Sequence, residues 1–255
     1  MASAPQLPLF YQELQPLSSE LHADFKMRQM ERAPWLATQH AIPLTVEEFP
    51  QAQRNYPIVF SSGGDGVPIA LMGLNEGINV FVDGDGTLLE TDIYLPAYVR
   101  RYPFMLARLT PDAEELSLCF DPKSDAIGAF DEGNPLFDNA EPTEATKAIL
   151  SFNESFEQAG QRTAAFMAEL KELDLLMEGE VAIQPANAEQ PFIYRGFQMV
   201  NEEKLADLRG DQLRKMTKSG LLPLIYAHLF SLPLMSAIFN RQVAQGKQPE
   251  PAPAA

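Results

Sequence analysis

Three apolar runs joined by short turns constrain the fold of this 255-residue chain more than any other feature. The runs are residues 56–61, 67–74 and 78–82, and the turns between them hold only five and three residues, rich in glycine and polar side chains. A parallel pairing needs a crossover of about a dozen residues or more. The sequence therefore predicts an antiparallel β-meander in the N-terminal half, with residues 116–120 as a further strand.

The clearest helical pattern covers residues 145–177, where small or apolar side chains recur at alternating steps of three and four. That spacing marks one face of a helix, and charged or amide side chains occupy the opposite face. Such a narrow apolar seam requires a partner helix. We expect the C-terminal helix of the same chain to be that partner, and a homo-oligomer formed through the 145–177 seam stays open as the alternative.

Residues 220–239 form an uncharged apolar run of twenty residues, which is the length of a membrane span. Pro223, Pro233, His228 and two serines argue against a span. A buried helix explains the same composition, so we expect no integral membrane insertion, although the run leaves that question open.

These patterns predict an α+β fold: an N-terminal antiparallel β-meander sheet, then a mostly helical half with a long amphipathic helix and a buried apolar C-terminal helix. The predicted segments are an irregular or partly helical lead-in over 1–40, an antiparallel sheet region over 41–120, an acidic linker or loop over 121–142, a helical half with a short β-hairpin over 143–243, and a disordered tail over 244–255. One single domain over 10–240 is the alternative division.

Composition excludes several classes of function. A net charge of −16 repels phosphate backbones, so no nucleic-acid partner is expected. The single cysteine, Cys119, cannot form an internal disulfide, and its apolar surroundings indicate a buried strand residue. The three histidines show no metal-ligand spacing, and no cofactor is expected. The first residues lack the basic and apolar regions of a secretory signal, which predicts a cytoplasmic location.

Asp83 and Asp85 follow an apolar strand in the order Asp-Gly-Asp-Gly-Thr. Two carboxylates in this position look like the first motif of haloacid dehalogenase-type phosphatases, in which one attacks phosphorus, the other protonates the leaving group and both help to hold Mg²⁺. The strands that precede the motif and the residues that follow it depart from that family. A hairpin tip is the favoured interpretation, because Asp-Gly pairs supply the backbone geometry of tight turns.

The segment 94–104, with the sequence YLPAYVRRYPF, combines aromatic and basic side chains. In a helical turn Tyr98 and Tyr102 share one face, whereas the adjacent Arg100 and Arg101 must point in different directions. An arginine here could hold the carboxylate or phosphate of a ligand, or it could pair with a structural carboxylate. These four residues and His228 are the candidate binding residues, although a hydrogen-bonded core histidine is the favoured interpretation of His228. No catalytic residue is predicted.

The same segment supports a family resemblance, together with residues 40–44, 48–49, 56–60, 79–82 and 220–232. The chain resembles the bacterial SapC family over nearly its whole length, and PAYVRRYPF is the most specific part of the match. The family is named for an association with a bacterial surface layer, and its members tend to be encoded near tryptophan-halogenase-like proteins and TonB-dependent receptors. The resemblance carries no established catalytic residues.

The resemblance implies a non-catalytic accessory or interaction protein of a cell-envelope, surface-associated or nutrient-uptake system, with a protein partner and a possible envelope association. Two alternatives remain at this point. One is the Mg²⁺-dependent phosphatase that uses Asp83 and Asp85. The other is a small-molecule-binding or modifying protein with Arg100 or Arg101 as an anion anchor.

Overall fold

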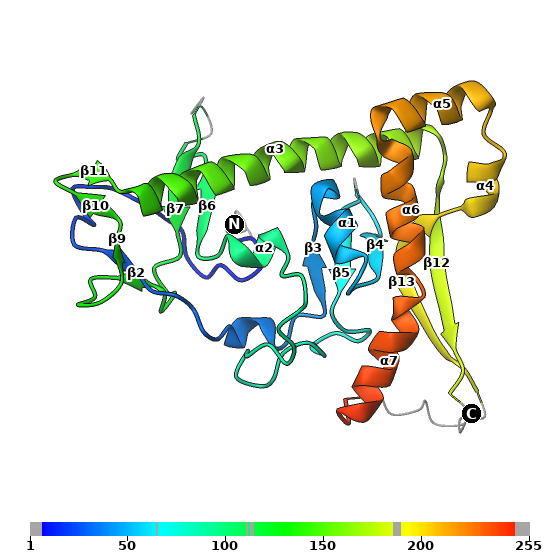
Figure 1. The fold of residues 1–255 in the computed structure, drawn as a ribbon, viewed down its shortest axis with the longest axis horizontal. Coiled ribbons are helices and arrows are strands. Elements are labelled where there is room, and N and C mark those ends of the chain that lie inside the picture. Colours follow the sequence, from blue (N-terminus) through cyan, green and yellow to red (C-terminus); the bar gives the residue numbers. More distant parts are fainter. Residues whose placement is uncertain (1–6, 65, 111, 113–114, 186–189, 248–255) are drawn as a thin grey trace, which may run out of the picture. The chain divides into compact units, whose positions relative to one another are not determined.

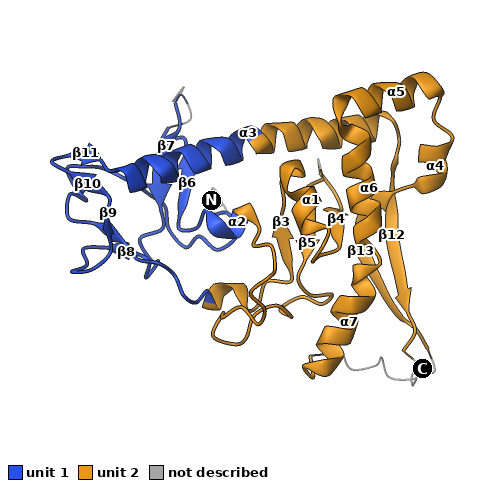
Figure 2. Ribbon diagram, viewed as in Figure 1, with its two compact units in different colours: residues 1–33, 98–158 blue, residues 34–97, 159–255 orange. Residues whose placement is uncertain are grey.

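The computed structural model describes residues 7–247 other than 65, 111, 113–114 and 186–189 (Figure 1). The chain forms two compact units: unit 1 comprises residues 1–33 and 98–158, and unit 2 comprises residues 34–97 and 159–255 (Figure 2). Each unit combines two separate pieces of the sequence, whereas the segments predicted above follow the chain in order. Residues 248–255 of the predicted 244–255 tail lie outside the described residues.

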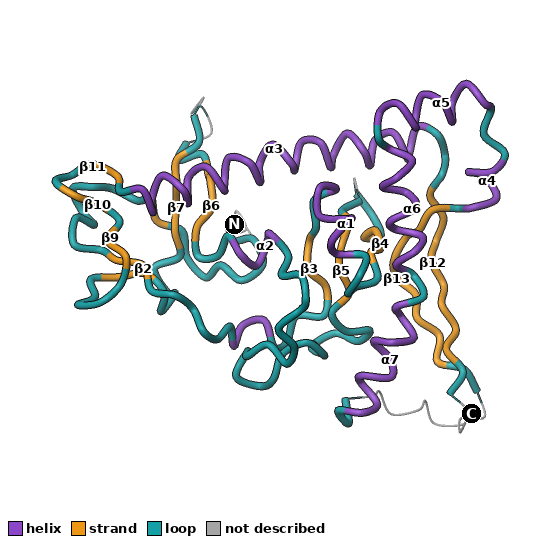
Figure 3. Tube along the Cα trace, in the orientation of Figure 1, coloured by secondary structure: helices purple, strands orange, loops and turns teal. Residues whose placement is uncertain are grey.

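Antiparallel sheets and helices make up both units, which confirms the predicted α+β class (Figure 3). Unit 1 holds short strands. The first sheet has the order β1-β7-β6, the second has the order β8-β2-β9, and β10 pairs with β11. Their bounds are β1 Gln15–Pro16, β2 Lys26–Met27, β6 Phe104–Ala107, β7 Ser117–Phe120, β8 Ile127–Gly128, β9 Asn134–Pro135, β10 Phe137–Asp138 and β11 Glu141–Pro142.

The core of unit 1 contains Phe104, Phe120, Ile127 and Leu136, all buried. Ile127 and Leu136 belong to the stretch 121–142, whose composition predicts an acidic linker or loop. That stretch also contains the strands β8 to β11. This stretch folds because the free energy gained by burying its few apolar side chains exceeds the preference of its acidic side chains for an exposed loop. Cys119 is buried in β7, as its apolar surroundings indicate.

Unit 2 is built on a five-stranded sheet with the order β12-β13-β4-β5-β3. Its strands are β3 Ala41–Pro43, β4 Ile58–Ser61, β5 Pro68–Leu71, β12 Leu176–Ile183 and β13 Phe192–Val200. The pairing of β4 with β5 is antiparallel, with Val59 opposite Ile69, and this confirms the first hairpin of the predicted meander.

The prediction of a third meander strand over residues 78–82 is wrong. Residues 78–82 form no named strand. They contribute an isolated bridge between Val82 and Leu88 and a 2.9 Å bond from the N–H of Val80 to the carbonyl oxygen of Met72, and β3 pairs with β5 instead. Asn79 supplies the physical reason, because its buried amide donates to the carbonyl oxygens of Leu36 and Gln39 and accepts from the backbone of Phe81. A buried amide must find such partners, and in residues 78–82 they replace a regular ladder, of which the one bond from Val80 to Met72 is present.

The helices complete the two units. They are η1 Pro34–Leu36, η2 Val46–Glu48, α1 Phe49–Ala52, α2 Ala97–Arg100, α3 Glu144–Glu172, α4 Glu202–Ala206, α5 Gly210–Ser219, α6 Leu221–Ser231 and α7 Leu234–Ala244. The long amphipathic helix is confirmed as α3, but it ends at Glu172 rather than at residue 177. Asp174 has a positive φ of 52°, which stops the helix, and β12 begins two residues later.

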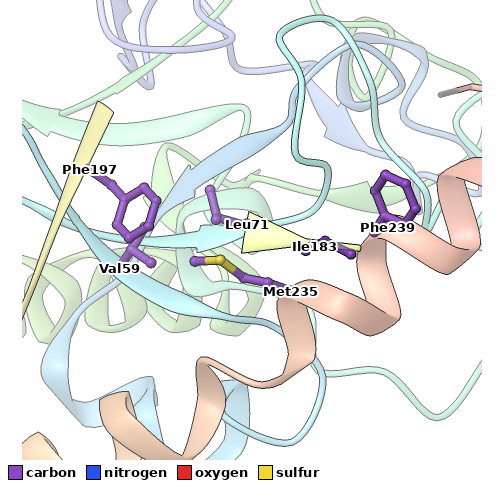
Figure 4. Close-up of a cluster of buried hydrophobic side chains, with 6 residues drawn as sticks. All are labelled: Val59, Leu71, Ile183, Phe197, Met235 and Phe239. Carbon is purple, nitrogen blue, oxygen red and sulfur yellow. The ribbon is translucent and has the colours of Figure 1, made fainter. Parts of the chain in front are cut away.

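Figure 4 shows the core of unit 2, in which Val59 and Leu71 from the central strands meet Ile183 and Phe197 from the β12–β13 hairpin, and Met235 and Phe239 from α7 cover them. Each such side chain contributes about 1.5–3 kcal/mol when it leaves water. The predicted C-terminal apolar helix is present as α6 and α7, and α6 packs against β4 and β13. Within the described residues, the run Leu221–Ala244 is long and apolar enough to cross a membrane, a property that core helices share.

Candidate functional site

The segment that contains PAYVRRYPF forms α2, a short turn and the beginning of β6. The backbone N–H of Ala97 donates to Glu48 Oε1 at 2.6 Å, which satisfies one of the free N–H groups at the start of α2. The backbone N–H of Phe104 then donates to the carbonyl oxygen of Arg101 at 2.8 Å and closes the turn. The second bond fixes the turn that carries Arg101 and Tyr102.

A cavity of about 320 Å³ lies in unit 1 beside this turn. Arg100, Arg101 and Tyr102 contribute to its wall, so the structure brings three of the five candidate binding residues together. The opposite wall comes from the first turns of α3, where Ile149, Phe152 and Asn153 lie, and Met27 and Phe104 add apolar surface.

Arg101 is the most unusual of these residues, because its side chain is only 5% exposed. Its guanidinium carbon lies 4.4 Å from the centroid of the Tyr98 ring and 4.3 Å from that of Phe156. Aromatic faces attract a cation and replace part of the hydration that it loses. Tyr98 therefore contributes by holding Arg101 rather than by lining the cavity.

The charge of Arg101 has a carboxylate nearby. Its Nη1 lies 3.6 Å from Glu157 Oε1, a separation longer than an ordinary N–H···O bond. Glu157 is partly exposed and keeps contact with water. The Nε atom of Arg101 is buried and has no hydrogen-bond partner in the protein. The nearby carboxylate of Glu157 matches the interpretation in which the arginine pairs with a structural carboxylate. The interpretation as an anion anchor stays a prediction.

The tyrosines around Arg101 stay protonated. Burial raises the pKa of Tyr11 and the pKa of Tyr98 above the ordinary value for a tyrosine. The positive charge of Arg101 lowers both pKa values, but by less than burial raises them. Burial also raises the pKa of Tyr102 to about 12. The Tyr11 hydroxyl donates to the carbonyl oxygen of Phe104 at 2.7 Å. These phenols are neutral hydrogen-bonding groups near pH 7, and none is activated as a base.

Asn153 is the residue that sequence reasoning missed. Its side chain is 2% exposed, its Nδ2 donates to the carbonyl oxygen of Ile149 at 2.9 Å, and its Oδ1 is buried without a partner. A flipped amide would place oxygen against oxygen, so the bond to Ile149 fixes which atom is left over. The available signal was an asparagine four residues after Ile149, on the apolar face of a long helix.

His228 belongs to unit 2, whereas the other four candidates belong to unit 1. Its Nδ1 lies 2.7 Å from the carbonyl oxygen of Ile58, and its Nε2 accepts a 3.1 Å bond from the backbone N–H of Val200. The second bond requires an unprotonated Nε2, so Nδ1 carries the proton. Burial lowers the pKa of His228 to about 4. With both ring nitrogens bonded to the backbone, this side chain holds α6 against β4 and β13.

Asp83 and Asp85 lie in a tight turn closed by the antiparallel Val82–Leu88 bridge. Asp83 Oδ1 accepts hydrogen bonds from the backbone N–H groups of Asp85 and Thr87 at 3.0 and 2.9 Å. This is an Asx-type turn. The phosphatase hypothesis requires both carboxylates at the end of a central parallel strand, and the geometry here is that of a hairpin tip.

Possible metal ligands and the single thiol are the remaining reactive side chains. Within it, no group of three or more His, Cys, Asp or Glu side chains is arranged to hold a metal ion. Burial raises the pKa of the Cys119 thiol and keeps it protonated.

The comparisons with known proteins give one match. A family model described as SapC matches residues 17–238, which is most of the chain. No curated protein and no solved structure matches it.

Proposed function

The chain belongs to the SapC family, and from that premise we propose that it is a non-catalytic accessory protein that binds a protein partner through the outer face of α6 and α7. The partner would be a component of a cell-envelope, surface-associated or nutrient-uptake system. The single observation that carries the proposal is an exposed apolar stripe along these two helices.

The stripe consists of exposed side chains at steps of three and four, and therefore on one face. Leu232 and Pro233 keep right-handed helical dihedral angles, so α6 continues almost directly into α7. Tyr226 is 42% exposed, Phe230 is 71% exposed, and their rings stack with centroids 5.6 Å apart. The full stripe is Pro223, Tyr226, Phe230, Pro233 and Ala237.

An exposed stripe of this kind favours association. Large aromatic side chains are enriched at protein interfaces. Those that act as hot spots cost about 2 kcal/mol or more of binding free energy when they are truncated. Apolar residues at this spacing are the contact pattern of a helix that lies in a groove of another protein. The unburied rings of Tyr226 and Phe230 would become the anchors of such a contact.

Charge favours a protein partner over two other occupants. A chain with a net charge of −16 is repelled by an anionic membrane surface. A second copy of the chain would bring two such charges together. A partner protein with an apolar groove would cover the stripe.

The test is affinity purification of the full chain from its source cells, followed by binding measurements with each purified candidate. We expect one protein to bind the wild-type chain and to lose at least about 30-fold in affinity when Tyr226→Ser and Phe230→Ser are combined. Leu21→Ser is the matched control, because Leu21 is 72% exposed in unit 1. The control should leave the affinity unchanged.

Three results would overturn the proposal. The first is a partner that binds the double variant and the wild-type chain equally well. The second is co-sedimentation of the wild-type chain with anionic vesicles that the double variant loses, which would assign the stripe to a membrane. The third is a dimer of the wild-type chain that the double variant converts to a monomer.

A further inference from the structure

The outer face of α5 carries two exposed cations, Arg214 and Lys218, four residues apart. Side chains at this spacing lie on one face of a helix, about 6 Å apart along its axis. Asp211, on the same face, already pairs with Arg209 at 3.0 Å. An open depression of about 760 Å³ lies over this face, and its lining residues are Gly210, Asp211, Arg214, Lys215, Lys218 and Ser219.

The pairing of the cations distinguishes these two. Acidic side chains outnumber basic ones by 35 to 19, so an exposed cation commonly has a carboxylate within reach. The cations with such a partner include Lys123, Lys147, Arg162, Arg195, Lys204 and Arg241. Lys215 lies 3.5 Å from Glu169. Neither Arg214 nor Lys218 forms an ion pair with any residue that the structure describes, so both charges are available to another molecule.

Charge is distributed unevenly along the chain. Residues 209–241 hold five basic side chains and one acidic side chain, a net charge of +4, whereas the rest of the chain carries −20. At the far end of this segment Arg241 is paired with Glu90. The available positive charge therefore lies at the α5 end.

The cations of α5 adjoin the beginning of the apolar stripe. Gly220, with a φ of 81°, ends α5 and begins α6, and α5 packs against α6 (Figure 1). Pro223, the first residue of the stripe, follows Lys218 by five positions, and no Asp, Glu, Lys or Arg lies between Lys218 and Arg241. A protein that covers the beginning of the stripe therefore comes close to α5.

We propose that α5 binds an acidic segment of the same protein partner that covers the stripe, an inference that rests on the proposed function. Two carboxylates about 6–7 Å apart match Arg214 and Lys218, which is the spacing of residues i and i+2 in an extended segment or i and i+4 in a helix. The arginine binds its carboxylate with two N–H groups, and the lysine acts as a compact charge. This contact sets the direction in which the partner lies along α6 and α7.

Screening favours a short acidic segment over an anionic membrane. At physiological ionic strength exposed charges interact little beyond about 8 Å. A segment that lies on α5 interacts mainly with the cations of α5. A plane of anionic headgroups extends well past that distance and also meets the −20 charge of the rest of the chain.

The first test uses a peptide of ten glutamates as the probe, added to the ¹⁵N-labelled full chain at about 20 mM salt, where screening is weak. We expect saturable shifts of backbone amide signals concentrated in Gly210–Ser219. Arg214→Gln combined with Lys218→Gln should reduce these shifts about fivefold or more. Lys123→Gln combined with Lys147→Gln removes the same charge from exposed cations of unit 1 and should leave the shifts unchanged. Shifts that avoid α5, or that survive in the α5 double variant, would overturn the proposal.

The stability of α5 provides the second test. Lys218 lies in the last turn of α5, where a positive charge also stabilises the helix dipole. Arg214 lies outside that turn. Arg214→Gln should therefore weaken the peptide shifts about twofold or more while the melting temperature stays within about 2 °C of wild type. Loss of binding only in variants that also melt earlier would assign the two cations to the stability of α5 and would overturn the proposal.

The third test measures the kinetics of binding to the partner that affinity purification identifies. Charge attraction mainly raises the association rate and is screened by salt, whereas apolar contacts mainly set the dissociation rate. Arg214→Gln combined with Lys218→Gln should lower the association rate about tenfold at about 20 mM salt and reduce its dependence on salt. Tyr226→Ser combined with Phe230→Ser should mainly raise the dissociation rate.

These kinetics separate the two proposals. A partner whose affinity depends on Tyr226 and Phe230, but which associates equally fast with wild type and the α5 double variant, would overturn the acidic contact and leave the proposed function standing. A partner that binds the Tyr226 and Phe230 double variant as tightly as wild type would overturn the proposed function instead.

Discussion

Glu48 Oε1 lies 2.6 Å from the backbone nitrogen of Ala97, a residue 49 positions later in the chain. The same carboxylate accepts from the Tyr94 hydroxyl at 3.0 Å and from the backbone N–H and the hydroxyl of Thr45 at 2.8 and 2.9 Å. Four donors thus converge on one buried side chain within unit 2. The backbone N–H of Ala97, at the beginning of α2, is therefore bonded by a residue outside PAYVRRYPF.

We predict that Glu48→Gln destabilises the protein by about 1–3 kcal/mol, because the amide turns an NH₂ group toward donors and leaves at least one of them unsatisfied. Chemical denaturation at pH 7 measures the effect. Glu47→Gln is the control, since the neighbouring Glu47 is half-exposed and pairs with Arg162 at the surface. Surface pairs contribute about 0–1 kcal/mol, so the control should stay near wild type. Equal effects of the two substitutions would contradict the anchoring role of Glu48.

We predict that Asp83 acts in the turn and has no role in phosphate hydrolysis. Asp83→Ala should cost about 1 kcal/mol, because it removes the acceptor for the N–H groups of Asp85 and Thr87. Asp83→Asn retains a side-chain oxygen and should preserve most of that stability. Thermal unfolding of both variants measures the difference.

The same pair of variants tests the phosphatase hypothesis. A nucleophile needs the carboxylate, so both substitutions would abolish a Mg²⁺-dependent hydrolysis of p-nitrophenyl phosphate. We expect no such hydrolysis in the wild-type chain. Its presence, with loss in Asp83→Asn, would restore the phosphatase hypothesis.

We predict that the free energy of unfolding falls in mild acid because His228 is protonated in the unfolded chain but not in the folded chain. Its pKa is about 4 in the folded chain, because of burial, against an ordinary value of 6.5. Between these two values the unfolded chain binds a proton that the folded chain excludes. The stabilisation is therefore complete above pH 6.5 and falls as the pH is lowered toward 4, by at most about 1.4 kcal/mol per pH unit.

The measurement is the free energy of unfolding of wild type and of His228→Gln at several values between pH 4 and pH 7. Glutamine does not titrate, so the variant should be less stable at pH 7 but should lose less stability on acidification. His40→Gln is the control: burial also lowers the pKa of His40, but this side chain is only half-buried. It should flatten the pH dependence less than His228→Gln. Parallel curves for wild type and His228→Gln would refute the prediction.

The sequence by itself determined those helices and hairpins whose formation depends on residues close together in the chain. The steps of three and four near Ile149 predict α3, and the five-residue turn before Val67 predicts the antiparallel pairing of β4 and β5. Both follow from side-chain periodicity and loop length, which are properties of a short window of sequence. The candidate site was found only in part, because Arg101 belongs to a recognisable motif and Asn153 does not.

Only the tertiary structure decided which distant residues complete each environment. Asn79 turns an apolar run into an irregular segment because its amide finds partners around residue 36, and no local rule places those partners there. Arg101 is buried against the ring of Phe156, a residue 55 positions later in the sequence. The sequence alone established an acidic α+β chain with its main helices and a family resemblance. The two cations of α5 that form no ion pair among the described residues, and the uncovered stripe of α6 and α7, became visible only once ion pairs and buried faces could be accounted for in three dimensions.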